Sequence, residues 1–205
     1  RHICFLRSDF GGGITREGTG WLAGPRLLVT SAHVVHRTGQ QASKPLSVTI
    51  IPALDGDGHE PYDRFTVSTD AIHLPVNDPV EGSPDDYAVI VIPSTPTAGW
   101  FGLKMLSASV KTVDDVNVSG YPEIVSLKSI DHKMRQFRCA GSVTCEERFL
   151  TYKIDTTEGQ SGSPVWINEG GKIGMVVGIH VQATVDGNRA IRITPQVYDF
   201  INKFQ

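Results

Sequence analysis

Gly159-Gln160-Ser161-Gly162-Ser163-Pro164-Val165 is the most informative segment of this 205-residue chain, for architecture and chemistry alike. Glycines on both sides of Ser161 permit a tight turn, because glycine accepts backbone conformations that other residues avoid. Such a turn presents one side chain and brings the N–H groups of Gly159 and Ser161 toward one point. A serine hydroxyl becomes reactive when a base takes its proton and N–H donors stabilise the oxyanion that forms. An ordinary Gly/Ser-rich turn is the alternative, so the upstream residues are needed to decide.

A histidine upstream of this segment supplies the base that such a serine needs. It lies in Leu28-Val29-Thr30-Ser31-Ala32-His33-Val34-Val35, where a β-type segment stops at small residues. A single helical turn over Ser31–Val35 would present the imidazole, and the small neighbours would let it turn toward a partner. An isolated histidine here would more often be structural. Together with the serine segment, His33 is the predicted base.

An acidic residue at the start of an apolar strand completes the set. The segment is Asp85-Asp86-Tyr87-Ala88-Val89-Ile90-Val91-Ile92. Asp86 touches the predicted strand directly and is predicted to accept the imidazole N–H, which would fix the tautomer of His33. Asp85 is the alternate, and an exposed acid in a turn is the structural alternative.

Short β-type segments recur along the whole chain, whereas long helical periodicity is nearly absent. Gly and Pro separate these segments, and their spacing indicates an all-β sandwich or a pair of barrels. The predicted strands are His2–Arg7, Thr19–Ala23, Arg26–Thr30, Ser47–Ile51, Phe65–Val67, Tyr87–Ile92, Val116–Gly120, Met134–Val143, Leu150–Ile154, Pro164–Ile167, Lys172–Val181 and Ala190–Ile193.

Two lobes and one terminal helix are predicted from this pattern. Residues 93–102 read as a connection, so the lobes are placed at 1–95 and 96–205. The helix is placed at about 195–204, because Thr194 is a good N-cap and proline suits the first helical position.

Composition excludes several classes of protein. Hydrophobic residues make up 40% of the chain, which is enough for a core, and no apolar stretch approaches the roughly 20 residues of a membrane helix. The net charge is −3, and Lys and Arg are scattered. We therefore expect no nucleic-acid partner, no membrane partner and a monomeric protein.

The cysteines leave the redox compartment open. Cys4, Cys139 and Cys145 are an odd number, so at least one is unpaired within the chain. Cys139 and Cys145 would lie roughly 20 Å apart on a regular strand, so they could pair only across a fold-back or bulge near Gly141. A bridge from Cys4 to one of them and three free thiols are the other possibilities. We expect a secreted protein, and a domain excised from a longer chain or an intracellular protein remains an alternative.

The order His33…Asp86…Ser161 resembles that of the chymotrypsin clan of serine proteases, and more closely its glutamyl-endopeptidase-like branch of the staphylococcal protease type. The matching segments run over nearly the whole chain: Gly18–Leu22, Thr30–Val35, Asp86–Ile90, Gly159–Val165, Val177–His180 and Ile191–Ile201. The resemblance implies an all-β fold of two packed six-stranded antiparallel barrels with a short C-terminal helix. His33 and Asp86 would come from the first barrel and Ser161 from the second.

The resemblance also implies an activity. It implies a serine endopeptidase that cleaves a protein or peptide substrate through an acyl-enzyme intermediate, with an oxyanion hole at the N–H groups of Gly159 and Ser161. No cofactor and no catalytic metal are implied. Gln160 stands where zymogen-type members have an aspartate that pairs with a newly cut N-terminus, so activation by that ion pair is not expected here.

Two residues give opposite indications of specificity. His180 in Gly178-Ile179-His180 matches the histidine that meets an acidic side chain in the glutamyl branch, and Thr156 would add a hydroxyl. Asp155 matches the aspartate that captures Lys or Arg in trypsin-like members. We favour cleavage after Glu or Asp over cleavage after Lys or Arg. Val181 and Gln182 would pair with the substrate backbone.

Two further hypotheses come from other classes of function. One is a catalytically inactive protease fold that holds a peptide without cutting it. The other is an esterase or lipase, for which the Gly-x-Ser-x-Gly motif is incomplete, since Ser163 stands in its final place.

Overall fold

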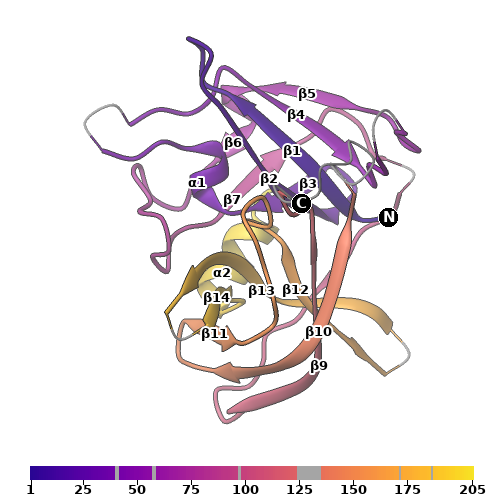
Figure 1. Ribbon diagram of the computed structural model, residues 1–205, viewed down its shortest axis with the longest axis vertical. Coiled ribbons are helices and arrows are strands. Elements are labelled where there is room, and N and C mark those ends of the chain that lie inside the picture. Colours follow the sequence, from indigo (N-terminus) through magenta and orange to yellow (C-terminus); the bar gives the residue numbers. More distant parts are fainter. Residues whose placement is uncertain (40–41, 57–58, 97, 124–134, 171, 186) are drawn as a thin grey trace.

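The chain forms two β-rich lobes, one above the other, as a computed structural model describes them for residues 1–39, 42–56, 59–96, 98–123, 135–170, 172–185 and 187–205 (Figure 1). The first lobe contains β1 (Ile3–Asp9), β2 (Thr15–Gly24), β3 (Leu27–Thr30), α1 (Ala32–Val35), β4 (Ser47–Pro52), β5 (Phe65–Ser68), the 3₁₀ turn η1 (Thr69–Ala71), β6 (Ile72–His73) and β7 (Ala88–Val91). The second contains β8 (Gly102–Leu103), β9 (Thr112–Gly120), β10 (Phe137–Cys145), β11 (Phe149–Tyr152), β12 (Pro164–Glu169), β13 (Lys172–Thr184), β14 (Gly187–Arg192) and α2 (Pro195–Asn202).

The strand order of each lobe follows a barrel. In the first lobe the order is β5-β4-β1-β2-β3-β7-β6, which is nearly closed. In the second lobe the order β12-β9-β10-β11-β14-β13 is closed by pairing of β12 with β13, and β8 adds in parallel to the outer edge of β13. Alternation of side chains gives the sheet a buried inner face and an exposed outer face: Phe65 and Val67 of β5 are buried, whereas Thr66 and Ser68 are exposed. The predicted all-β double barrel is confirmed.

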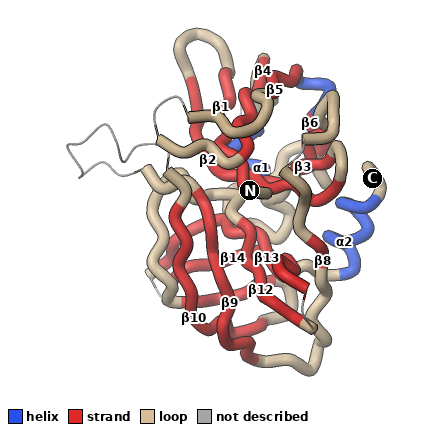
Figure 2. Tube along the Cα trace, turned by 90° about the vertical axis from the view of Figure 1, so that its right-hand side faces the viewer, coloured by secondary structure: helices blue, strands red, loops and turns tan. Residues whose placement is uncertain are grey.

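A hydrophobic cluster between the lobes joins them. It combines residues of both sheets, among them Trp21 of β2, Trp166 of β12 and Ile179 of β13. Phe101 lies between the two indoles, with its ring centroid 6.1 Å from that of Trp21 and 5.8 Å from that of Trp166. Helix α2 lies at the side of the molecule (Figure 2), and its Phe200 packs edge-on against Tyr87 of the first lobe at 5.3 Å. The lobes therefore share one apolar interface rather than touching only at the surface.

Some local features differ from the sequence prediction. The two-residue strands β6 and β8 and the turn η1 were not predicted, because such short segments carry no periodic signal. Helix α2 ends at Asn202 instead of residue 204, and Thr194 caps it by accepting the N–H of Val197. All three cysteines are free thiols. Among the helices of the described residues, none is long and apolar enough to cross a membrane.

Candidate active site

His33 and Asp86 form a buried pair in the first lobe. His33 Nδ1 lies 2.8 Å from Asp86 Oδ2, and the backbone N–H of His33 donates to Asp86 Oδ1 at 2.9 Å. The carboxyl side chain is fully buried, and His33 is 8% exposed. Since both carboxylate oxygens accept from the same residue, the imidazole is fixed in position as well as in tautomer.

One backbone N–H and one guanidinium support this pair from two directions. The N–H of Gly82 donates to Asp86 Oδ2 at 2.7 Å, so the carboxylate has a second donor on the same oxygen. On the other side, the Arg16 guanidinium donates to the carbonyl oxygens of His33 at 2.5 Å and His36 at 3.2 Å. These carbonyls belong to the C-terminal end of α1, which has no hydrogen-bond partners within the helix, and a cation stabilises them there. The single helical turn is therefore held by contacts outside itself.

Ser161 lies in a turn of the second lobe that contacts the first lobe closely. Its carbonyl oxygen accepts the N–H of Thr19 at 2.9 Å. A Cβ on Gly162 would lie 2.1 Å from the Thr19 carbonyl oxygen and 2.9 Å from the Ser31 nitrogen, so only glycine fits there, with φ +88°. The turn around Ser161 thus packs against the residues that precede His33. Among the described residues, the imidazole of His33 has Asp86 as its side-chain partner and forms no side-chain hydrogen bond with Ser161.

Two peptide groups in this turn leave N–H donors free. The Glu158 carbonyl oxygen accepts from the N–H of Glu123 at 2.6 Å, and the Gln160 carbonyl oxygen accepts from the N–H of Ser163 at 2.9 Å. In a trans peptide the C=O and N–H point in opposite directions. The N–H groups of Gly159 and Ser161 therefore point away from Glu123 and Ser163, the residues that bind the two carbonyl oxygens. Neither N–H has an acceptor among the residues that the structure describes.

Two side chains hold the turn around Ser161 in this shape. Thr19 Oγ1 donates to the Gly159 carbonyl oxygen at 3.0 Å and accepts the N–H of Tyr121 at 2.9 Å. Gln160 is 3% exposed, and its Oε1 accepts the N–H of Thr157 at 2.8 Å. The amide of Gln160 thus makes its contact within the turn itself, without a charged partner.

His180 lies next to the turn around Ser161 and is 3% exposed. Its backbone pairs with the turn on both sides: its carbonyl oxygen accepts the N–H of Gly162 at 2.8 Å, and its N–H donates to the Ser163 carbonyl oxygen at 2.9 Å. Its Nδ1 lies 2.6 Å from the hydroxyl of Tyr152. Burial, reinforced by the charge of His33, lowers the pKa of His180 to about 3, so its imidazole is neutral at ordinary pH.

The other predicted specificity residues lie in different surroundings. Asp155 is exposed and Thr156 is half-buried, and neither forms a side-chain hydrogen bond with another described residue. Val181 is 1% exposed. Gln182 is half-buried and reaches across to the first lobe, because a Cβ on Gly82 would lie 1.5 Å from its Oε1. The first-lobe loop that holds Asp86 is therefore in close contact with β13.

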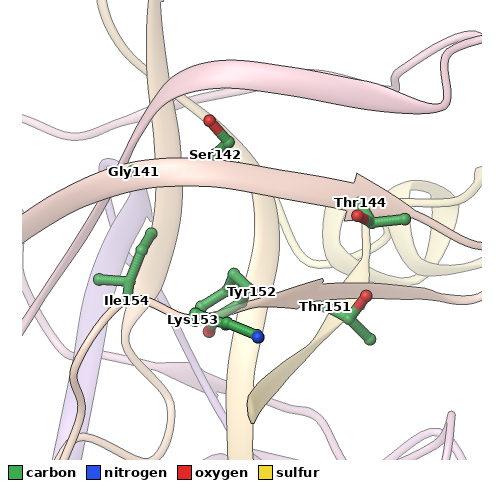
Figure 3. Close-up of a pocket in the computed structure, with 7 residues that line it drawn as sticks. All are labelled: Gly141, Ser142, Thr144, Thr151, Tyr152, Lys153 and Ile154. Atoms are coloured by element: carbon green, nitrogen blue, oxygen red, sulfur yellow. The ribbon is translucent and has the colours of Figure 1, made fainter. Parts of the chain in front are cut away.

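A pocket of about 540 Å³ lies away from His33 and Ser161. Its walls come from β10, β11 and the residues after β11, as Figure 3 shows. Tyr152 lines this pocket and also contacts His180 through its hydroxyl. In the described parts of the chain no group of three or more His, Cys, Asp or Glu side chains is arranged to hold a metal ion.

The geometry and the sequence place the chain in one protein family. A model of the trypsin-like peptidase domain matches residues 18–179, so the chain belongs to the trypsin-like peptidase family. It is 27% identical over 197 residues to a glutamyl endopeptidase of Bacillus licheniformis, which covers 91% of this chain and 59% of that protein. It is also 27% identical over 187 residues to a protein of Bacillus subtilis named extracellular metalloprotease, covering 89% of this chain and 56% of the relative. The chain therefore spans less than two thirds of the length of these relatives.

Solved structures share the fold. A Glu endopeptidase structure in complex with MPD superimposes with a TM-score of 0.79 at 25% identity, covering 98% of this chain and 89% of the other. An inactivated protease paralogue of the scabies mite superimposes with a TM-score of 0.70 at 16% identity, covering 98% and 94%. The second likeness concerns the fold alone.

Sequence reasoning missed several residues around the site. Thr19, Gly82, Tyr152 and the backbone of Glu123 all make contacts that position predicted site residues. Thr19 lies inside the segment Gly18–Leu22 that carries the family resemblance, which is the one signal that could have indicated it. A lone Tyr in a strand gives no comparable signal.

Proposed function

We propose that the chain is a serine endopeptidase in which Ser161 is the nucleophile, His33 the base and Asp86 the residue that orients the base. The observation that carries this proposal is the buried contact of 2.8 Å between His33 Nδ1 and Asp86 Oδ2, beside a glycine-flanked serine. Asp86 accepts the Nδ1–H, which leaves Nε2 of His33 as an acceptor for the serine proton. Asp85, the alternate, is half-buried and contacts Arg148 of the second lobe at 3.4 Å instead.

The proposed reaction follows from these positions. Ser161 Oγ attacks the carbonyl carbon of the peptide bond while His33 Nε2 takes its proton, and the N–H groups of Gly159 and Ser161 stabilise the oxyanion. The C–N bond then breaks, and His33 returns the proton to the leaving amine. A water molecule, deprotonated by His33, attacks the acyl-enzyme and releases the carboxylate product and the free serine.

We further propose a preference for Glu or Asp before the cleaved bond. His180 supports it, because its imidazole lies against the nucleophile turn and is a hydrogen-bond donor for an oxygen acceptor. The 27% identity to a glutamyl endopeptidase supports the same preference. Cleavage after Lys or Arg is the competing proposal, and it would depend on Asp155, which is exposed.

The proposed biological setting is a secreted monomer that cleaves proteins or peptides. The name of the Bacillus subtilis relative includes the word extracellular, which supports secretion. The net charge of −3 supports the expectation that nucleic acid is not a partner.

Ser161→Ala tests the activity. We expect kcat on peptide substrates to fall by about 10⁴-fold or more, because the nucleophile is lost. Ser109→Ala removes an exposed hydroxyl that belongs to none of the candidate site residues. It is the matched control and should keep full activity. A fluorophosphonate probe should label the wild-type protein and the control once per chain and leave Ser161→Ala unlabelled. An unlabelled, inactive wild-type protein would favour the peptide-binding module without catalysis.

A peptide library with sequenced product ends tests the specificity. Cuts after Glu and Asp are expected, whereas cuts after Lys and Arg would assign the specificity to Asp155 and overturn the acidic preference.

A further inference from the structure

Tyr152 and His180 form a contact between two strands that are not neighbours. The order of strands is β11-β14-β13, so β14 separates Tyr152 of β11 from His180 of β13. Ala190 of β14 pairs with His180 on one side and with Leu150 on the other, and Tyr152 lies two residues from Leu150 on the same face. Because Ala190 has only a methyl group, the phenol can reach over it to the imidazole.

The contact lies in the apolar interior of the second barrel. Tyr152 is 4% exposed and belongs to a cluster made of residues such as Val118, Val143 and Val177. His180 is 3% exposed. Among the described residues, His180 Nδ1 is the sole hydrogen-bond partner of the phenol oxygen. A buried hydroxyl that donates to nothing is costly, so the arrangement favours donation of the Tyr152 proton to Nδ1 of His180.

This direction of donation determines where the imidazole carries its own proton. Burial raises the pKa of Tyr152 well above its ordinary value, so the phenol keeps its proton. In a neutral imidazole one nitrogen accepts and the other donates. If Nδ1 accepts from Tyr152, then Nε2 carries the N–H. A charged imidazole would have to donate from Nδ1 as well, and the phenol proton would be left without an acceptor.

We propose that Tyr152 is a positioning residue for specificity, which holds His180 as a neutral imidazole with its N–H on Nε2. This N–H then donates to the side-chain oxygen of the substrate residue before the cleaved bond. The inference rests on the acidic preference proposed above and goes beyond it, since here a neutral imidazole binds the carboxylate of the substrate.

The proposal makes the preference independent of pH over the working range. A positively charged imidazole would lose its proton as pH rises, and the preference for Glu over Leu would fall with it. A neutral donor has no proton to lose there. We expect the ratio of kcat/KM for a Glu peptide over the matching Leu peptide to stay constant within about twofold from pH 6 to 9.

The test combines NMR spectroscopy with kinetics on the whole chain labelled with ¹⁵N-histidine. The chain has seven histidines, and comparison of its ¹H–¹⁵N correlation spectrum with that of His180→Leu identifies the signals of His180. In the wild-type protein at pH 7 we expect an unprotonated Nδ1 and a protonated Nε2. In Tyr152→Phe, which removes only the hydroxyl, we expect a mixture of tautomers and a fall of about tenfold in the Glu-over-Leu ratio. Turnover of the Leu peptide should change by less than about twofold.

Tyr198→Phe is the matched control, because Tyr198 lies on α2 and its hydroxyl is not the hydrogen-bond partner of His180. It should leave both the tautomer and the ratio unchanged. A wild-type His180 that carries its proton on Nδ1, or is charged at pH 7, would overturn the proposal even if Tyr152→Phe does not fold. An unchanged ratio in a folded Tyr152→Phe would overturn the role in specificity. If the wild-type protein shows no preference for Glu, the acidic preference fails, whereas the tautomer still decides separately whether Tyr152 fixes His180.

Discussion

His33 in the first lobe and His180 in the second are both buried imidazoles whose Nδ1 meets a single oxygen atom. For His33 that oxygen is the Asp86 carboxylate at 2.8 Å, and for His180 it is the Tyr152 phenol at 2.6 Å. A carboxylate only accepts hydrogen bonds, so it requires the proton on Nδ1, whereas the phenol donates and puts the proton on Nε2. The two rings are therefore expected to be opposite tautomers. His33 presents an acceptor at Nε2, as a base requires, and His180 presents an N–H at Nε2, which can donate to an oxygen of the substrate.

The variant with the largest expected effect on activity changes the hydrogen-bond partner of His33. Asp86→Asn replaces an oxygen that only accepts by an amide that also donates, so the imidazole can adopt the wrong tautomer. We expect kcat to fall by about 10⁴-fold for Glu and Leu peptides alike, as measured in steady-state assays. Asp85→Asn is the control and should keep activity within about twofold. An Asp85→Asn variant as impaired as Asp86→Asn would assign the orienting role to the wrong carboxylate.

A second test removes the other imidazole. His180→Leu takes away the proposed donor without touching His33 or Ser161, so kcat/KM for the Glu peptide should fall by about 10²-fold while the Leu peptide is cleaved at nearly the wild-type rate. The measurement is kcat/KM for both peptides. An equal fall for both peptides would mean that His180 supports the nucleophile turn rather than specificity.

A third test uses the effect of pH on stability. The pKa of His180 is about 3 in the folded chain and 6.5 in the reference state, so the unfolded chain binds more protons between these values. The stabilisation is complete above pH 6.5 and is lost as pH falls toward 3. Between pH 7 and pH 5 this one group should lower the free energy of unfolding by about 2 kcal/mol.

Urea unfolding of His180→Leu at both pH values isolates this contribution. The variant should lose less stability than the wild-type protein on going from pH 7 to pH 5, by about 2 kcal/mol. His59→Gln, at an exposed position, should behave as the wild-type protein does. An unchanged pH dependence in His180→Leu would show that the pKa of His180 is not lowered in the folded chain.

The smallest expected effect on activity concerns Thr19, the first-lobe residue whose hydroxyl binds the turn around Ser161. Thr19→Val keeps the shape but leaves the Gly159 carbonyl and the Tyr121 N–H without their partner. We expect kcat to fall by about tenfold for both peptides, with KM nearly unchanged. Thr19→Ser retains the hydroxyl and should keep most of the activity. If Thr19→Val is fully active, the turn holds its shape without the Thr19 hydroxyl.

Local sequence patterns predicted the parts of the molecule that depend on neighbours in the chain. The spacing of β-type segments and turn residues predicted an all-β sandwich or a pair of barrels, and the family resemblance implied the double barrel, which is confirmed. The glycines around Ser161 and the position of Asp86 before a strand predicted the candidate site, whose assigned roles stay predictions. These patterns could be recognised because a turn or a strand start constrains residue types over a few positions.

Contacts across the barrels could not be predicted in this way. Tyr152 and His180 are 28 residues apart, and Thr19 and Gly159 are 140 apart. Which side chains meet depends on strand register and on small residues such as Ala190 between them, and neither leaves a mark in the local sequence. The short strands β6 and β8 were missed because two residues show no alternation.

The amide of Gln160 has a consequence for the conditions under which the protein can work. A carboxylate at this position needs an ammonium partner, which loses its charge near pH 8 and is screened by salt. The contact from Thr157 N–H to Gln160 Oε1 involves no titrating group and no net charge. The geometry around Ser161 should therefore persist at high pH and high salt, where an ion pair would be weakened.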